Sequence, residues 1–280
     1  MKLHLFSLFI SPKDRLETRL IYVFKSGYKG KSLNSDHDKL KGANRNLHPK
    51  LKEVVDKIKD EALRGKVEAF LENPTIEIEG KTYSGMPLET SPAGLSHHHS
   101  YLGGFVEHVV STVEIALTLC KVAGKVYHGK VDQDLVIAGS ILHDIFKPLE
   151  YIEREDGTYG LTPLAERLDH LTLIVAELIK RGFPLNLVHI MASHMGWQNS
   201  PIGPRTIEAL IVHLADSADS QLNGETLRAA RFLSRQATGM EPVQLTGKEA
   251  FEIVNAKTSK GWEGAKKAVE KIRQKRHKAV

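Results

Sequence analysis

The segment Val136-Ile137-Ala138-Gly139-Ser140-Ile141-Leu142-His143-Asp144 determines how the rest of the chain is interpreted. It is almost wholly apolar until it ends in an imidazole beside a carboxylate, which predicts a buried helix with polar groups at its end. A buried charge without a partner costs several kcal/mol, so both side chains require compensation. A neutral core histidine beside an aspartate that caps a turn would also explain this segment, and only the rest of the chain separates the two interpretations.

Length and composition set the outer limits. The chain has 280 residues, 41% of them hydrophobic, which predicts one main domain with smaller appendages. The net charge of +5 only weakly favours a polyanionic partner. The single cysteine, Cys120, lies in an apolar stretch, excludes an internal disulfide framework and indicates a reducing cytosol. The apolar start of the chain is far shorter than the about 20 residues that span a membrane. We therefore expect a cytoplasmic protein without a membrane segment.

Hydrophobic periodicity predicts a mainly all-α fold. Residues 49–71 have apolar positions at three- and four-residue intervals, which favours one or two amphipathic helices. Residues 75–83 alternate polar and apolar side chains around Gly80, as in a short β-hairpin. Residues 11–48 carry no sustained period, and the apolar segment 1–10 is interpreted as a strand or helix edge. From residue 104 onward we expect five helices: 105–122, a helix capped by Asp132 or Asp134 that ends near Lys147, 162–182, 184–195 and 204–222.

Histidines are concentrated in this helical region, since ten of the 14 lie between residues 97 and 213. Each expected helix contributes a nitrogen or oxygen donor, and the set comprises His108, His143, Asp144, His170, His194 and Asp216. Facing helices of a bundle that supply such donors can build a metal site. Imidazole with carboxylate suits zinc, iron, manganese, nickel or cobalt, whereas carboxylate with water suits magnesium. The sequence predicts a divalent metal without choosing among these.

The ordered donors resemble the HD superfamily of metal-dependent phosphohydrolases. The blocks that carry the resemblance are Gly-Gly-Phe-Val-Glu-His (103–108), Leu-His-Asp-Ile-Phe-Lys (142–147), Asp-His (169–170), Ser-His-Met-Gly (193–196) and His-Leu-Ala-Asp-Ser-Ala-Asp (213–219). They cover about residues 95–222. The resemblance implies an HD-domain helical bundle, and we expect an N-terminal appendage with the hairpin (1–94), the HD core (95–224) and a basic helical extension (225–280).

Within the superfamily, the opening and closing blocks look most like 3′-to-5′ exonucleases, namely YhaM-type exoribonucleases and archaeal helicase-associated single-strand nucleases. The resemblance implies hydrolysis of single-stranded DNA or RNA, with a DNA-repair helicase as a further partner. The alternative is a phosphohydrolase of nucleotides or other small phosphoesters, which the same core would serve. Two departures stand out: many relatives carry paired histidines where this chain has His194-Met195, and residues 1–94 show no OB-type pattern.

Individual roles follow from the resemblance. It implies that the first metal is held by His108, His143, Asp144 and Asp216, and that Asp144 bridges to a second metal held by His170 and His194. Asp144 and Lys147 would be catalytic, with the lysine facing phosphate. One or two ions are expected, with manganese or magnesium first and iron, nickel, cobalt or zinc as alternatives. A bound metal lowers the pKa of water from about 15.7 toward 7, which suits phosphoester hydrolysis without a side-chain nucleophile.

Several further side chains are candidates for orienting a ligand or contacting the substrate. At most two of His97, His98 and His99 can face the site, and a polar loop would explain them equally well. His213 and Asp219 could orient ligands, although a core histidine and a solvent-facing carboxylate are equally consistent with their positions. His189 is interpreted as core. Three aromatic residues expected in loops could stack on a base or pack at helix ends: Tyr101, Tyr151 and Trp197.

The C-terminal region is strongly basic. Arg228, Arg231 and Arg235 recur at helical spacing, and the end of the chain carries Lys266, Lys267, Lys271, Arg273, Lys275 and Arg276. Such a run is usually a solvated helix face. The alternative is an arm that follows nucleic-acid phosphates, because lysine and arginine gain affinity there from counterion release.

Overall fold

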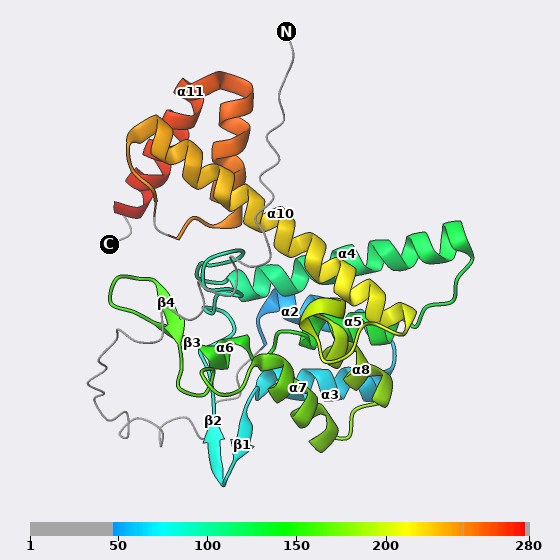
Figure 1. The fold of residues 1–280 in the computed structure, drawn as a ribbon. Helices are drawn as coiled ribbons and strands as arrows, with labels where there is room; N and C mark the ends of the chain where they lie inside the picture. Colours follow the sequence, from blue (N-terminus) through cyan, green and yellow to red (C-terminus); the bar gives the residue numbers. More distant parts are fainter. Residues whose placement is uncertain (1–46, 243, 278–280) are drawn as a thin grey trace. The chain divides into compact units, whose positions relative to one another are not determined.

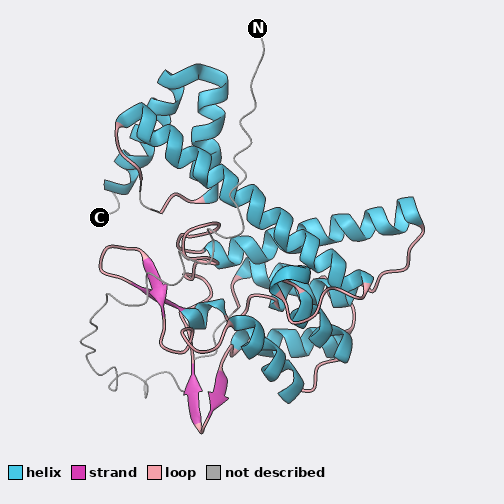
Figure 2. Cartoon of the chain, viewed as in Figure 1, coloured by secondary structure: helices cyan, strands magenta, loops and turns pink. Residues whose placement is uncertain are grey.

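The computed structural model describes residues 47–242 and 244–277. Over these residues the chain is a helical bundle with two short antiparallel hairpins (Figures 1 and 2), so the mainly all-α prediction is confirmed. No helix in the described ranges is long and apolar enough to cross a membrane. The apolar start of the chain and all but the last two residues of the unassigned segment 11–48 lie outside the described residues.

The first described elements are two helices and a hairpin, as predicted. Helix α2 (Pro49–Val55) begins with proline, and α3 (Glu61–Glu72) is capped by Asp60, whose carboxylate accepts hydrogen bonds from the second and third residues that follow it. Strands β1 (Ile76–Ile78) and β2 (Lys81–Tyr83) pair around Gly80, whose φ is 72°. Apolar side chains of α2 and α3 belong to the same core as the following helices, and the domain boundary at 94/95 stays a prediction.

The centre of the bundle is formed by α4 (Gly104–Tyr127), α5 (Gln133–Leu142) and α10 (Ile207–Thr238), which pack against one another (Figure 1). Asp132 caps α5 through hydrogen bonds to two backbone N–H groups. A side chain at Gly139 would come within 2.8 Å of Ile190 on α8, so this glycine allows α5 close to its neighbour. The predicted end of α5 at Lys147 is wrong: the helix ends at Leu142, and His143 and Asp144 lie in the turn that follows.

A second hairpin separates α5 from the next long helix. After the short α6 (Lys147–Glu150), strands β3 (Tyr151–Glu153) and β4 (Tyr159–Leu161) pair across a loop that contains Asp156-Gly157, a favoured hairpin sequence. The predicted helix 162–182 is wrong at its start, because Thr162 caps only one turn, at Ala165. Helix α7 (His170–Lys180) begins eight residues later, where the Asp169 carboxylate accepts from Thr172 N. Helices α8 (Leu185–Ser193) and α9 (Gly196–Asn199) follow.

Helix α10 runs well beyond its predicted end at Leu222 and continues to Thr238. The helix continues through Gly224, since one glycine costs a helix only about 1 kcal/mol relative to alanine. A Cβ at Gly224 would lie 3.3 Å from His97 O, so the missing side chain lets this loop approach α10. Helix α11 (Gly247–His277) is interrupted at Gly261, and it packs on the second half of α10 around a separate small core that includes Tyr101, Leu227 and Ile253.

Candidate metal centre

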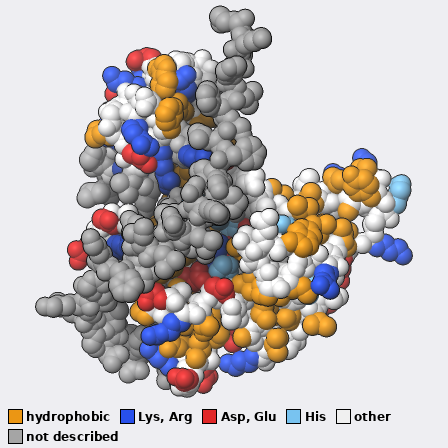
Figure 3. Space-filling view, viewed as in Figure 1, with side chains coloured by type: hydrophobic (Ala, Val, Ile, Leu, Met, Phe, Trp, Pro, Cys, Tyr) orange, Lys and Arg blue, Asp and Glu red, His pale blue; other side chains and the backbone are white. Residues whose placement is uncertain are grey.

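Five helices deliver their predicted donors to one point. His108 lies in the first turns of α4, His143 and Asp144 directly after α5, His170 at the start of α7, His194 after α8, and Asp216 within α10. The structure brings these six side chains together as two groups, in each of which the ligand atoms lie within 4.8 Å of one another: His108, His143 and Asp216, and Asp144, His170 and His194. Figure 3 shows histidine and acidic side chains next to one another near the middle of the visible face.

The four histidines share one orientation, with Nδ1 turned outward to an acceptor and Nε2 facing the centre. The acceptors of Nδ1 are Asp219 Oδ2 for His108 (2.7 Å), Ser140 O for His143 (2.9 Å), Glu150 Oε1 for His170 (3.2 Å) and Met191 O for His194 (2.8 Å). An acceptor at Nδ1 fixes the proton there and leaves the lone pair of Nε2 free to bind a metal.

Asp144 lies between the two groups. Its Oδ2 is 3.3 Å from His108 Nε2 and 3.5 Å from His143 Nε2. Its Oδ1 is 3.3 Å from His170 Nε2 and 3.8 Å from His194 Nε2. Each carboxylate oxygen therefore faces a different pair of histidines, so Asp144 would contribute to both candidate metal positions.

Four buried atoms at this point have no hydrogen-bond partner among the described residues: Asp144 Oδ1, Asp144 Oδ2, His170 Nε2 and His194 Nε2. Of these, Asp144 Oδ2 forms an ion pair with the Lys147 ammonium, which leaves three atoms without a neighbouring lysine. Leaving a buried polar group without a partner costs about 1–3 kcal/mol, and more for a charged one. Three such atoms that converge on one point are explained by a group that accepts all their lone pairs. A divalent cation does so, and imidazole and carboxylate are ligands that transition metals favour. The residues present therefore fit a metal.

The charges also call for a cation at the centre. Burial alone would raise the pKa of Asp144, but Lys147 and His143 outweigh it and hold that pKa well below its usual value. Burial likewise opposes ionisation of Asp216, yet His108 and His143 hold its pKa well below the usual value. Burial lowers the pKa of His194 to about 4, so this imidazole is neutral at pH 7 and can bind a metal.

The pKa of His108 gives the clearest evidence of the negative charge at the centre. Burial by itself would lower its pKa, but Asp144, Asp216 and Asp219 raise the pKa of His108 well above the usual value. Without an ion, a proton on His108 balances these carboxylates, and a metal would replace that proton.

Only one side of the cluster reaches the surface. The side chains of Asp216, Lys147 and His170 are 14%, 13% and 11% exposed, while those of His108, His143 and His194 are fully buried. Lys147 Nζ lies 2.7 Å from Asp144 Oδ2, so its ammonium group stands beside the ligand at the accessible edge. The predicted phosphate-facing role of Lys147 is consistent with this position and stays a prediction.

Two carboxylates hold ligand histidines from behind. Asp219 is buried between His108 Nδ1 and Ser111 Oγ, which donates to it at 2.5 Å. It therefore orients His108, and it does not face solvent. Glu150 Oε1 accepts hydrogen bonds from both His170 N (2.5 Å) and His170 Nδ1. Sequence reasoning did not identify Glu150, because no helical spacing connects residues 150 and 170. Its only signal was an acidic residue shortly after the His-Asp pair.

Two of the three consecutive histidines border the cluster, and His97 is exposed. His98 Nε2 lies 3.4 Å from Ser220 Oγ, which in turn donates to Asp216 Oδ1, and His99 Nε2 lies 3.7 Å from Asp219. Burial lowers the pKa of His98 and of His99 to about 3. Both rings are therefore neutral at pH 7.

The remaining candidates separate by burial. Tyr101 is buried and its hydroxyl donates to Glu107, so its ring cannot stack on a base. Tyr151 is also buried, at the start of β3, whereas Trp197 is 64% exposed. His213 Nδ1 donates to His194 O and thereby holds the backbone of a ligand residue. His189 lies outside the cluster and accepts from Arg205 N.

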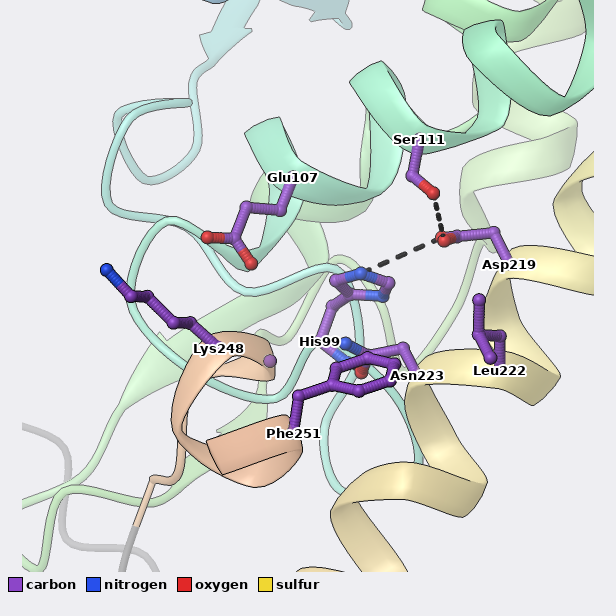
Figure 4. Close-up of a pocket in the computed structure, with 9 residues that line it drawn as sticks. His99, Glu107, Ser111, Asp219, Leu222, Asn223, Lys248 and Phe251 are labelled. Atoms are coloured by element: carbon purple, nitrogen blue, oxygen red, sulfur yellow. Dashed lines mark hydrogen bonds and ion pairs between the residues drawn. The ribbon is translucent and has the colours of Figure 1, made fainter. Parts of the chain in front are cut away.

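A pocket of about 290 Å³ lies between α4, α10 and the start of α11 (Figure 4). Asp219 and His99 line it together with Glu107, Phe251 and Lys248. Asp219 also holds His108, so one side chain separates this pocket from the ligands.

The basic region is a folded helix and not a free arm. The two parts of α11 pack on α10, and three of the six predicted cations are paired with glutamates: Lys267 with Glu263, Lys271 with Glu252 and Arg276 with Glu249. Arg228 and Arg235 are paired as well, and Arg231 donates to Ser96 O and Ser100 Oγ. Within the described part of the chain, no ion pair involves Lys266, Arg273 or Lys275.

Residues 105–221 match the HD domain family. The chain is 43% identical over 206 residues to the dihydroneopterin 2′,3′-cyclic phosphate phosphodiesterase of Methanocaldococcus jannaschii, covering 74% of this chain and 80% of that protein. It is 33% identical over 143 residues to the 3′-5′ exoribonuclease YhaM of Listeria monocytogenes, and likewise over 144 residues to that of Shouchella clausii. Those matches span 43% of the exoribonucleases and 47% or 48% of this chain. No solved structure gave a significant match.

The residues that match the HD domain family, 105–221, include all six donors of the cluster. The predicted resemblance is therefore confirmed, and the chain belongs to the HD superfamily of metal-dependent phosphohydrolases.

Proposed function

We propose that this protein is a metal-dependent phosphodiesterase that opens a small cyclic phosphate, of the class of a pterin 2′,3′-cyclic phosphate. The observation that carries the hydrolase chemistry is the buried set of Nε2 and carboxylate atoms without partners. The substrate class is supported by a relative that aligns over 80% of its own length, against 43% for the exoribonucleases. The small-phosphoester alternative therefore takes precedence over the predicted exonuclease.

Each side chain at the site has a defined task in this reaction. When bound, divalent ions supply a nucleophilic water at neutral pH and neutralise phosphoryl charge. Asp144 would join the two metal positions, and the four histidines would hold the ions through Nε2. The carboxylate of Asp144 keeps the pKa of Lys147 above its usual value despite burial, so the ammonium stays charged and can bind a phosphoryl oxygen at the accessible edge.

The donor set also bears on the metal. Four imidazoles with two carboxylates favour manganese, iron, cobalt, nickel or zinc over magnesium, which prefers oxygen ligands. We expect two ions, because Asp144 faces both groups. The second group offers His170, His194 and Asp144 even though Met195 stands where many relatives have a histidine.

A 3′-to-5′ exonuclease remains the second candidate. The 33% identity to YhaM across the HD core and the unpaired cations of α11 favour it. The predicted partners, a single strand of DNA or RNA and a DNA-repair helicase, depend on this alternative. The limited exposure of the ligands favours a small substrate over a strand.

One assay separates the two. The purified protein is loaded with manganese, iron, zinc or magnesium, or treated with chelator, and given dihydroneopterin 2′,3′-cyclic phosphate or 3′- and 5′-labelled single strands. We expect metal-dependent opening of the cyclic phosphate to a monoester and intact strands. Release of mononucleotides from the strands at a higher kcat/KM would instead establish the exonuclease.

A further inference from the structure

We propose that Trp197 and His213 form a ring-binding subsite beside the metal cluster, which holds the planar nitrogen heterocycle of the substrate. The inference rests on the proposed function, and it names the part of the substrate that gives the enzyme its specificity. A pterin and a purine share the required chemistry, because both are flat aromatic rings that can stack on an indole.

The indole is exposed and yet held in place. Trp197 is 64% exposed, and its ring centroid lies 5.8 Å from that of His213 at an interplanar angle of 86°. An added Cβ would come within 2.3 Å of the Trp197 ring at Gly203 and within 2.4 Å of the His213 ring at Gly196, whose φ is +77°. The backbone thus fits closely around both rings, while much of the indole stays open to a ligand.

The position of this pair follows from the helical spacing of α10. His213, Asp216 and Ser220 lie at intervals of three and four residues, so they share one face of the helix. Ser220 Oγ donates to Asp216 Oδ1, and His213 Nδ1 donates to His194 O. The backbone of His213 therefore lies about 4.5 Å along the helix axis from that of Asp216, whose side chain is the most exposed of the six candidate ligands.

The other aromatic candidates do not serve this purpose. Tyr101 and Tyr151 are buried, and Phe251 lines the pocket behind Asp219, away from the accessible edge. Among the described aromatic residues considered for stacking, Trp197 alone combines exposure with contact to His213, which in turn hydrogen-bonds the backbone of His194. A short linker between ring and phosphate would let the ring rest on the indole while the phosphate reaches the metal positions and the Lys147 ammonium.

The decisive experiment compares the two tryptophans of the chain. The metal-loaded full chain is assayed with dihydroneopterin 2′,3′-cyclic phosphate and with glycerol 1,2-cyclic phosphate, which has the same phosphodiester ring and no heterocycle. We expect Trp197→Ala to lower the ratio of kcat/KM between these substrates about tenfold, mainly through KM, and Trp197→Phe to restore most of it. Trp262→Ala, which removes the half-exposed tryptophan of α11, should leave the ratio within twofold.

A binding readout keeps the inference separate from the proposed function. In Trp262→Phe, Trp197 is the only tryptophan, and its fluorescence should be quenched by neopterin or by guanosine monophosphate. Quenching by neopterin assigns a pterin, and quenching by the nucleotide alone assigns a purine. An unchanged substrate ratio without quenching by either probe overturns the subsite. If the wild-type protein opens neither cyclic phosphate, the proposed function fails, and the fluorescence still decides for or against the subsite.

Discussion

The metal cluster and helix α11 are both rich in charged or ligating side chains, yet the structure treats them in opposite ways. In the cluster the groups are buried, and Asp144 Oδ1, His170 Nε2 and His194 Nε2 have no hydrogen-bond partner in the part of the chain that the structure describes. In α11 the cations are largely exposed, and half of those predicted to bind nucleic acid are already paired with glutamates. Unmet polarity inside a protein is therefore a better indicator of chemistry than the number of charges on its surface.

The largest expected effect is at the bridge. Asp144→Asn keeps the shape of the side chain but removes its charge, so binding at both metal positions should weaken and hydrolysis should fall by about 10³-fold or more. Steady-state kinetics and metal content per chain measure this. Glu252→Gln, which removes an exposed ion pair with Lys271, is the matched control and should keep activity within twofold. Full activity in Asp144→Asn would contradict the assigned centre.

The next effect concerns the carboxylate behind His170. Glu150→Gln removes the charge that fixes the Nδ1 proton, so the metal concentration for half-maximal activity should rise about 10- to 100-fold. Glu153→Gln, an exposed neighbour on β3, should leave that concentration unchanged. A metal titration that does not distinguish these two variants would show that Glu150 has no influence on the metal.

Lowering the pH should decrease the free energy of unfolding of the metal-free protein. The pKa values of His98, His99 and His194 are lowered to about 3, 3 and 4, so below pH 6.5 the unfolded chain takes up protons that the folded chain does not. The stability due to these neutral rings is complete above pH 6.5, and it falls steadily as the pH is lowered toward 4.

Urea unfolding of chelator-treated protein between pH 7 and 4.5 measures this slope. His98→Asn should flatten it, whereas Glu252→Gln should not. A free energy of unfolding that stays constant over this range would show that the buried rings are protonated as readily as in the unfolded chain.

The smallest effect is expected from the unpaired cations of α11. The triple change Lys266→Gln, Arg273→Gln and Lys275→Gln should alter kcat/KM for a cyclic phosphate less than twofold. If the exonuclease candidate is correct, the same change should weaken binding to a single strand and reduce the salt dependence of that binding. The reason is that fewer phosphate contacts release fewer counterions when the strand binds. Filter binding at several salt concentrations distinguishes these outcomes.

Sequence reasoning predicted the site residues that fall on expected helices, and it missed a contact that depends on a turn. The donors from His108 to Asp216 were predicted because each falls on an expected helix. Glu150 was not, since its contact with His170 requires the β3–β4 hairpin, whose Asp156-Gly157 turn signal was overlooked. The end of α10 was predicted too early, at Leu222, whereas the helix continues through Gly224, where the missing side chain lets the loop at His97 approach.

Helix α10 has a consequence for any shortened version of this enzyme. Its first half carries Asp216 and Asp219, and its second half shares a core with α11 through Leu227 and Ala230. Deleting the chain after Thr238 would leave that apolar stripe and the ring of Tyr101 in water, close to the loop that bears His98 and His99. We therefore expect a shortened protein to need the C-terminal helix to keep the loop of His98 and His99 in place.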